Sequence, residues 1–88
     1  MLKISISEAV GQMVALALDG QVSGRWVELL RWSCHEQLSK GARVTIDLKN
    51  VSFADRDGIA LLQSLKNQGA EILNSNAFIV EQIKAAQR

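Results

Sequence analysis

Residues 44–62 read VTIDLKNVSFADRDGIALL, and this stretch decides the fold. Apolar and polar residues alternate over 44–48, which predicts a strand of the core. A glycine then opens an apolar run with helical spacing, so a helix is predicted over about 58–67. An aspartate, an arginine and a second aspartate lie between them, at 55–57. Because the first turn of a helix leaves backbone N–H groups and a positive dipole end exposed, we interpret this loop as the working surface of the protein.

Outside this stretch, the chain repeats the same two patterns. Residues 13–18, MVALAL, are apolar at every position, which is typical of a central strand buried on both faces. Residues 8–12 are predicted to form the hairpin turn before it. The expected strands are 2–6, 13–18, 44–48 and 70–73, and the expected helices are about 26–38, 58–67 and 76–86. This order predicts one α/β domain, residues 1–88, with a four-stranded mixed sheet and three helices in the order β-β-α-β-α-β-α.

Composition excludes several classes of function. Ten basic residues nearly balance nine acidic ones and form no block, so we expect no nucleic-acid binding. The single cysteine, Cys34, cannot form an internal disulfide, which favours a reduced, cytoplasmic location. The first residues, MLKISISEAV, lack the pattern of a signal peptide, and no apolar run approaches the ~20 residues of a membrane span.

The sequence offers little for catalysis. It contains no phosphate-binding glycine loop, no Cys/His metal spacing and no G-x-S-x-G motif. Asp47, Asp55 and Asp57 could be imagined as a magnesium site, but no lysine or glycine-rich loop accompanies them. Cys34 and His35 are neighbours on a predicted helix and point about 100° apart, so they form no dyad. We therefore expect no enzyme activity, no catalytic residues, no metal and no cofactor; an enzyme using the aspartates is the alternative.

The pattern of residues 44–65, VTIDLKNVSFADRDGIALLQSL, resembles the STAS domain, the fold of anti-sigma factor antagonists. That family has an apolar strand ending in Asp-Leu, a spacer, a Phe-like residue, and then Asp-Ser-Ser/Thr-Gly-Leu opening a helix. Leu18-x-Gly20-x-Val22 also fits, and the resemblance covers nearly the whole chain. It implies a non-catalytic regulatory module that binds a protein partner, such as a kinase-like anti-sigma factor.

The chain departs from the family pattern in two ways. The phosphorylatable serine of the family lies just before the glycine, where this chain has Asp57, and Arg56 replaces a small hydroxyl residue. Serine phosphorylation is therefore predicted to be absent. The Asp57 carboxylate either resembles the phosphorylated state weakly or only favours the start of the helix. Many family members also have one more strand and helix, so the resemblance implies a domain shortened at the C-terminus with an exposed sheet edge.

A second branch of the family is also similar. Its short members are cytoplasmic accessory subunits of ABC transporters that move phospholipid, and their loop Asp-Thr-Gly-Gly-Leu-Ala-Leu-Leu is similar to residues 55–62. The alternative function is therefore an accessory subunit that binds the transporter ATPase. In both branches the partner is expected on the loop and on the polar face of the next helix. The candidate partner-binding residues are Asp55, Arg56, Asp57, Gly58, Ala60, Gln63, Ser64 and Asn67.

Individual residues leave alternatives open. Asp55 either supports the loop through its side-chain oxygens or contacts a partner. Arg56 either pairs with a neighbouring acid, reaches an acid of a partner, or is simply solvated. Trp32 lies off the apolar face of its helix, so it either packs at the rim of the core or anchors a partner or a second copy. On the second interpretation, the chain is expected to form a weak homodimer.

Overall fold

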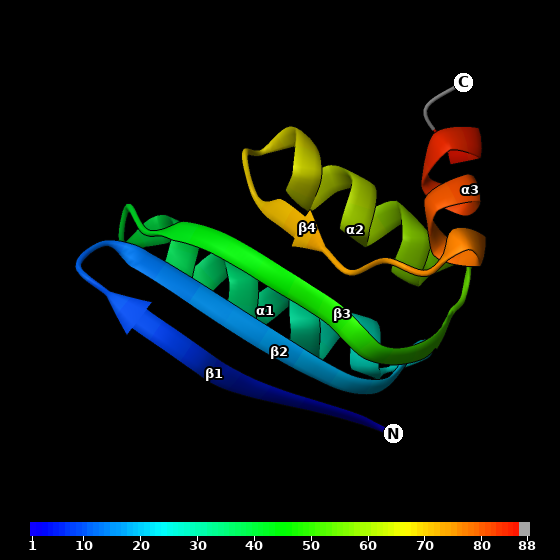
Figure 1. The fold of residues 1–88 in the computed structure, drawn as a ribbon, viewed down its shortest axis with the longest axis horizontal. Helices are drawn as coiled ribbons and strands as arrows, with labels where there is room; N and C mark the ends of the chain where they lie inside the picture. Colours follow the sequence, from blue (N-terminus) through cyan, green and yellow to red (C-terminus); the bar gives the residue numbers. More distant parts are fainter. Residues whose placement is uncertain (87–88) are drawn as a thin grey trace.

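The computed structural model describes residues 1–86 (Figure 1). The elements follow the predicted order of strands and helices. They are β1 (Leu2–Val10), β2 (Met13–Val22), α1 (Trp26–Ser39), β3 (Arg43–Ala54), α2 (Arg56–Asn67), β4 (Glu71–Leu73) and α3 (Ala77–Ala86). In this part of the chain, no helix is both long enough and apolar enough to cross a lipid bilayer.

The four strands form one mixed sheet in the order β1-β2-β3-β4. β1 pairs with β2 antiparallel, whereas the β2–β3 and β3–β4 pairs are parallel and are connected through α1 and α2. The hairpin turn is shorter than predicted, because β1 continues to Val10, which pairs with Met13. Gly11 has φ +60°, a conformation that suits a tight two-residue turn.

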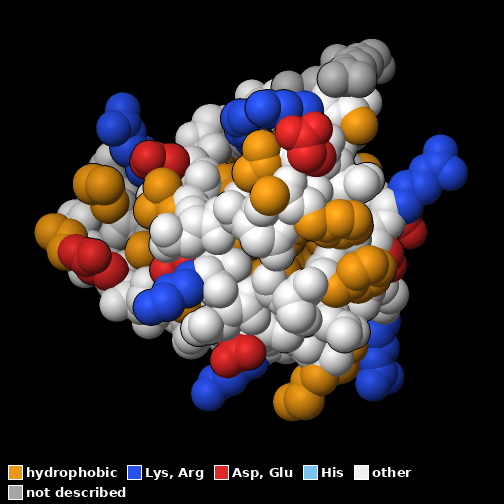
Figure 2. Space-filling model, turned by 45° about the vertical axis from the view of Figure 1, so that its right-hand side comes forward, with side chains coloured by type: hydrophobic (Ala, Val, Ile, Leu, Met, Phe, Trp, Pro, Cys, Tyr) orange, Lys and Arg blue, Asp and Glu red, His pale blue; other side chains and the backbone are white. Residues whose placement is uncertain are grey.

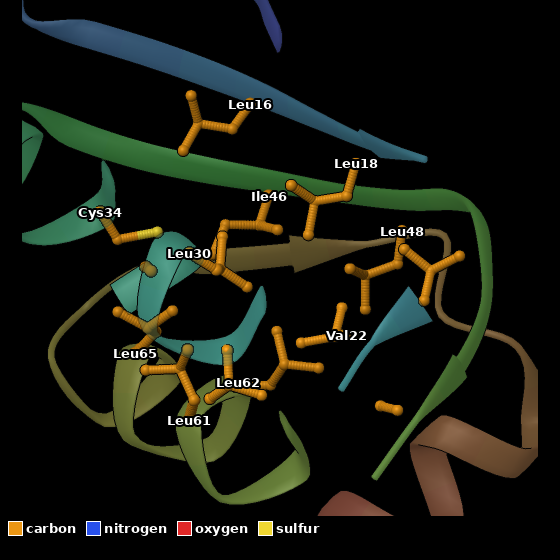
Figure 3. Close-up of a cluster of buried hydrophobic side chains, with 14 of the residues drawn as sticks. Leu16, Leu18, Val22, Leu30, Cys34, Ile46, Leu48, Leu61, Leu62 and Leu65 are labelled. Atoms are coloured by element: carbon orange, nitrogen blue, oxygen red, sulfur yellow. The ribbon is translucent and has the colours of Figure 1, made fainter. Parts of the chain in front are cut away.

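The core lies between one face of the sheet and the helices. Figure 3 shows strand side chains, such as Leu18 and Ile46, directed toward side chains of α1 and α2. The fully buried large side chains are Leu18, Leu30, Ile46, Leu48, Leu61, Leu62, Ile79, Val22 and Cys34. Burial raises the pKa of the Cys34 thiol to about 11, so the thiol stays neutral and unreactive.

The opposite face of the sheet is covered by no helix of the described chain. Ala15 and Ala17 of β2 are only half-buried there, and Met13 is 55% exposed. The prediction that β2 is buried on both faces is therefore wrong. The physical reason is that alanine costs little to expose, so an uninterrupted apolar run does not require two covered faces.

β3 extends well beyond the strand predicted over 44–48. After an irregularity in the register, its second half pairs with the end of β2, from Asp19 with Asn50 to Val22 with Ala54. Because β3 ends at Ala54 and α2 begins at Arg56, only Asp55 separates the strand from the helix. The helix therefore begins two residues earlier than predicted, so Arg56 and Asp57 belong to its first turn and not to a loop.

Neighbouring leucines of α1 offer a test of this packing. Leu30 is fully buried whereas Leu29 is 41% exposed. We expect Leu30→Ala to lower the free energy of unfolding by about 2–5 kcal/mol through lost burial and a cavity. The matched control Leu29→Ala should cost less than about 1 kcal/mol. Urea unfolding at low protein concentration measures both, and equal losses would contradict the orientation of α1.

Candidate functional site

The candidate site begins at Asp55, the one residue between β3 and α2. Its backbone is extended, with φ −80° and ψ −177°. Its N–H donates to the Val22 carbonyl at 3.1 Å, which continues the pairing of β3 with β2. Its own carbonyl accepts from the Ile59 N–H at 2.8 Å, which is the first bond of the helix. A single residue thus ends the strand and starts the helix.

The Asp55 side chain joins two segments that lie far apart in the sequence. One carboxylate oxygen accepts from the Gly58 N–H at 2.7 Å and caps α2. The other accepts from the Gly24 N–H at 2.9 Å, in the turn between β2 and α1. These two bonds hold the pKa of Asp55 below its usual value, and the bond from Gly24 has the larger effect. Because both oxygens are engaged, the geometry favours the supporting role of Asp55 over direct contact with a partner.

Gly58 is buried beneath the loop. A Cβ atom at this position would overlap with the carbonyl oxygen of Val22, so only glycine lets α2 approach β2 this closely. Gly58 therefore lies under the candidate surface and helps to set the position of α2.

Arg56 and Asp57 project from the first turn of α2 into solvent. Both side chains are exposed, and within residues 1–86 neither forms an ion pair or a side-chain hydrogen bond. Asp57 is the acidic residue of the first turn, where the helix dipole stabilises a carboxylate. Of the three charged residues at 55–57, Asp55 thus has its carboxylate engaged, whereas the charges of Arg56 and Asp57 are available.

The remaining candidate residues share the solvent side of α2. Ala60 and Asn67 are exposed, and Gln63 and Ser64 are half-buried. Together with Arg56 they recur at intervals of three or four residues, which places them along one side of the helix. The Ser64 hydroxyl also accepts from the Gln68 side-chain amide at 3.1 Å. The structure therefore groups six of the eight candidate residues on one surface, with Asp55 at its edge and Gly58 below.

Two phenylalanines that the sequence analysis missed complete this surface. Phe53 at the end of β3 is 42% exposed, and Phe78 in the first turn of α3 is 50% exposed. They flank an open groove of about 790 Å³ between the loop, α2 and α3. We call this region the α2–α3 surface, and its defining residues are Phe53, Arg56, Ala60, Gln63, Phe78 and Gln82. The sequence signal for their exposure was that neither phenylalanine falls at a core-facing position of its strand or helix.

The surface around this groove is chemically mixed. Figure 2 shows one side of the molecule, where hydrophobic side chains form patches between scattered acidic and basic side chains, several of which lie next to each other. Arg56 is the one cation among the residues that line the groove. Asp55 also lines the groove, but both of its carboxylate oxygens already accept backbone hydrogen bonds. An apolar groove whose available charge is a cation suits a partner that presents apolar side chains and a carboxylate.

The structure does not gather the three aspartates that were considered for magnesium. Asp47 is instead bonded to the Asn74 side chain and to the Lys49 N–H, each at 2.9 Å, and these bonds lower its pKa. Across residues 1–86, no three His, Cys, Asp or Glu side chains lie close enough together to hold a metal ion.

Comparison with known proteins identifies the fold. No protein-family model matches the chain, and no curated protein matches it either. A structure of the anti-sigma factor antagonist SpoIIAA in its unphosphorylated form superposes with a TM-score of 0.76, at 18% identity over 93% of this chain and 82% of that one. A crystal structure of Mglu gives a TM-score of 0.64 at 25% identity; the match covers 80% of this chain and only 19% of that one. The chain thus has the STAS-like fold that the sequence predicts.

The two aspartates of the loop should differ in their effect on stability. We expect Asp55→Ala to lower the free energy of unfolding by about 0.5–2 kcal/mol, because it removes the helix cap. Asp57→Ala is the matched control and should cost less, since its side chain makes no such bond. Thermal unfolding of the two variants at neutral pH measures the difference.

The effect of Asp55 should also depend on pH in a defined direction. The pKa of Asp55 is lowered in the folded protein, so its ionised form favours folding. Its contribution should be complete above the unfolded-state pKa of about 3.9 and vanish as the pH falls through the lower folded-state pKa. A stability difference between wild type and Asp55→Ala that persists unchanged in strong acid would contradict this assignment.

Proposed function

We propose that this chain is a non-catalytic regulatory domain that binds a protein partner through the α2–α3 surface. The observation that carries the proposal is the pairing of two half-exposed phenylalanines with the available cation of Arg56 around one groove. The carboxylate that lines this groove, Asp55, has both oxygens engaged with backbone N–H groups and is poorly placed to act on a substrate.

The residue types of this surface are those that dominate protein interfaces. Aromatic and arginine side chains contribute a large share of binding energy when a partner removes them from water. Ala60 leaves room for close approach, and Gln63 supplies polar contacts at the edge. All of these residues lie on a strand end or on helices, so little conformational freedom is lost on binding.

The likeness to an anti-sigma factor antagonist supports the class of partner. We propose that the chain binds a kinase-like anti-sigma factor in the cytoplasm and thereby relieves its inhibition of a sigma factor. The partner surface is expected to present a carboxylate to Arg56 and apolar side chains to Phe53 and Phe78.

This domain is proposed to work without a serine phosphorylation switch. SpoIIAA has been described in its unphosphorylated form, whereas this chain has the exposed carboxylate of Asp57 where the sequence resemblance places the family serine. A carboxylate carries one negative charge against nearly two for a phosphate, and no kinase or phosphatase adds or removes it. Partner binding would then be set by the amount of protein and not by its modification.

The binding surface can be tested with paired charge reversals. The tagged full chain should capture its partner from the native host. We expect Arg56→Glu to weaken binding of the identified partner at least about tenfold, which corresponds to about 1.4 kcal/mol. Lys49→Glu is the matched control, because it makes the same charge change at an exposed position on β3.

The identity of the partner separates the two candidate functions. A kinase-like anti-sigma factor supports the proposal, whereas an ATPase captured together with its permease would assign the chain to a transporter. If Arg56→Glu and Lys49→Glu bind the partner equally well, the partner does not bind at the α2–α3 surface.

The absence of a phosphorylation switch is a separate prediction. Incubation of the wild-type chain with ATP and the captured kinase-like partner should leave residue 57 unmodified, because a carboxylate lacks the hydroxyl that a serine kinase uses. Asp57→Ser restores that hydroxyl and serves as the positive control. Peptide mass spectrometry measures both, and a modified Asp57 in the wild type would refute this part of the proposal.

A further inference from the structure

We propose that the chain forms a symmetric homodimer in which the β1 strands of two copies pair antiparallel. β1 is the outermost strand of the sheet, and within the described chain no strand pairs with its outer edge (Figure 1). It is nine residues long. An edge of this length presents a row of backbone donors and acceptors that another strand can bind.

The backbone groups available on this edge can be identified. The Gln21 N–H donates to the Met1 carbonyl at 3.1 Å, which directs the peptide groups of residue 1 toward β2. Successive residues of a strand direct their peptide groups alternately to the two sides. The N–H and C=O groups of Leu2, Ile4 and Ile6 therefore point to the outer edge.

A bulge in β1 arranges its side chains on two distinct faces. The pairing with β2 is regular up to Ile6 and resumes at Glu8, so Ser7 is an extra residue. The open face of the sheet then carries Lys3, Ser5 and Glu8, which pair with Asp19, Ala17 and Ala15. The helix face carries Leu2, Ile4, Ile6 and Ala9. Without the bulge, Glu8 would lie on the helix face.

This arrangement is complementary to itself. We place a twofold axis at Ser5, so that Ser5 of one copy lies opposite Ser5 of the other. Because Ser7 is the extra residue of the bulge, Lys3 of one copy then lies directly opposite Glu8 of the other. On the helix face of the same pairing, Ile4 faces Ile6 and Leu2 faces Ala9. Opposite charges and apolar pairs both stabilise antiparallel strands, and no like charges face each other. Lys3 would also lie between two acids, Asp19 of its own copy and Glu8 of the second.

The helix side of β1 adds an apolar surface that such a dimer would cover. A groove of about 340 Å³ lies between β1 and α1, lined by Ile4, Ile6, Leu29 and Trp32 among others. Ile6 is 59% exposed and Trp32 is 63% exposed, so Trp32 does not pack at the rim of the core. In the proposed pairing, the isoleucines of the second copy lie beside this groove and shield it from water.

The pattern favours a second copy over an unrelated strand as the occupant of this edge. In a twofold interface, if residue i of one copy contacts residue j of the other, residue j of the first copy also contacts residue i of the second. Lys3 and Glu8 carry opposite charges, so both of these contacts are attractive. The β1 edge and the α2–α3 surface lie at opposite sides of the molecule (Figure 1). The dimer therefore leaves the proposed partner surface accessible, and the two proposals can fail independently.

Sedimentation equilibrium of the full chain tests the dimer directly. We expect a reversible monomer–dimer equilibrium with dimer evident at about 1 mM, because pairing of one strand buries a small interface. Glu8→Lys places two lysines opposite each other at both ends of the pairing and should weaken the dimer at least about tenfold. Glu81→Lys makes the same charge change on α3 and should leave the dimer unaffected. A wild-type chain that stays monomeric at about 1 mM would overturn the proposal.

Disulfide trapping tests the register independently of charge. Ser5 lies on the proposed axis in a non-hydrogen-bonded pair, where the two Cα atoms are about 4.5 Å apart and a disulfide can form. Ser5→Cys should therefore oxidise rapidly to a covalent dimer, whereas Lys40→Cys, which is exposed at the end of α1, should not. The buried native Cys34 contributes no cross-link. Equal oxidation rates for the two variants would overturn the register.

Discussion

The two hydrogen bonds that the Asp55 carboxylate accepts hold together the end of the molecule that carries the proposed partner surface. They connect the turn before α1, through Gly24, to the first turn of α2, through Gly58. Because β3 ends one residue earlier, the carboxylate fixes the direction in which α2 leaves the sheet. The close contact of Gly58 with Val22 depends on the same direction. The positions of Arg56 and Asp57 on the surface follow from this junction.

The junction supports the proposal that this charged segment serves recognition. The Asp55 carboxylate, which would otherwise be the candidate base, accepts two backbone hydrogen bonds, whereas the neighbouring Arg56 side chain is exposed and available to a partner. The apolar part of the α2–α3 surface comes from Phe53 and Phe78, which the fold brings to the same groove. At the outer edge of the sheet, the bulged β1 strand is the separate surface that we propose for a second copy. The two proposed surfaces therefore do not compete.

Much of the fold could be predicted because apolar spacing reports which side of an element is buried. The order of elements and the strand–loop–helix junction followed from that spacing. The two-sided burial of β2 did not hold, since half-exposed alanines such as Ala17 give the same pattern as covered ones. In the second half of β3 burial does not alternate along the strand, and this half is held by pairing with β2. The exposure of Phe78 depends on how α3 packs against α2, which no local pattern reports.

Hydrogen exchange of the complex tests the central claim most directly. The chain would be mixed with the partner that it captures, and amide exchange would be compared with that of the free chain. The account predicts slower exchange at residues 53–67 and 77–85, which form the loop, α2 and α3. Protection confined to β1, or to the open face of the sheet, would contradict it.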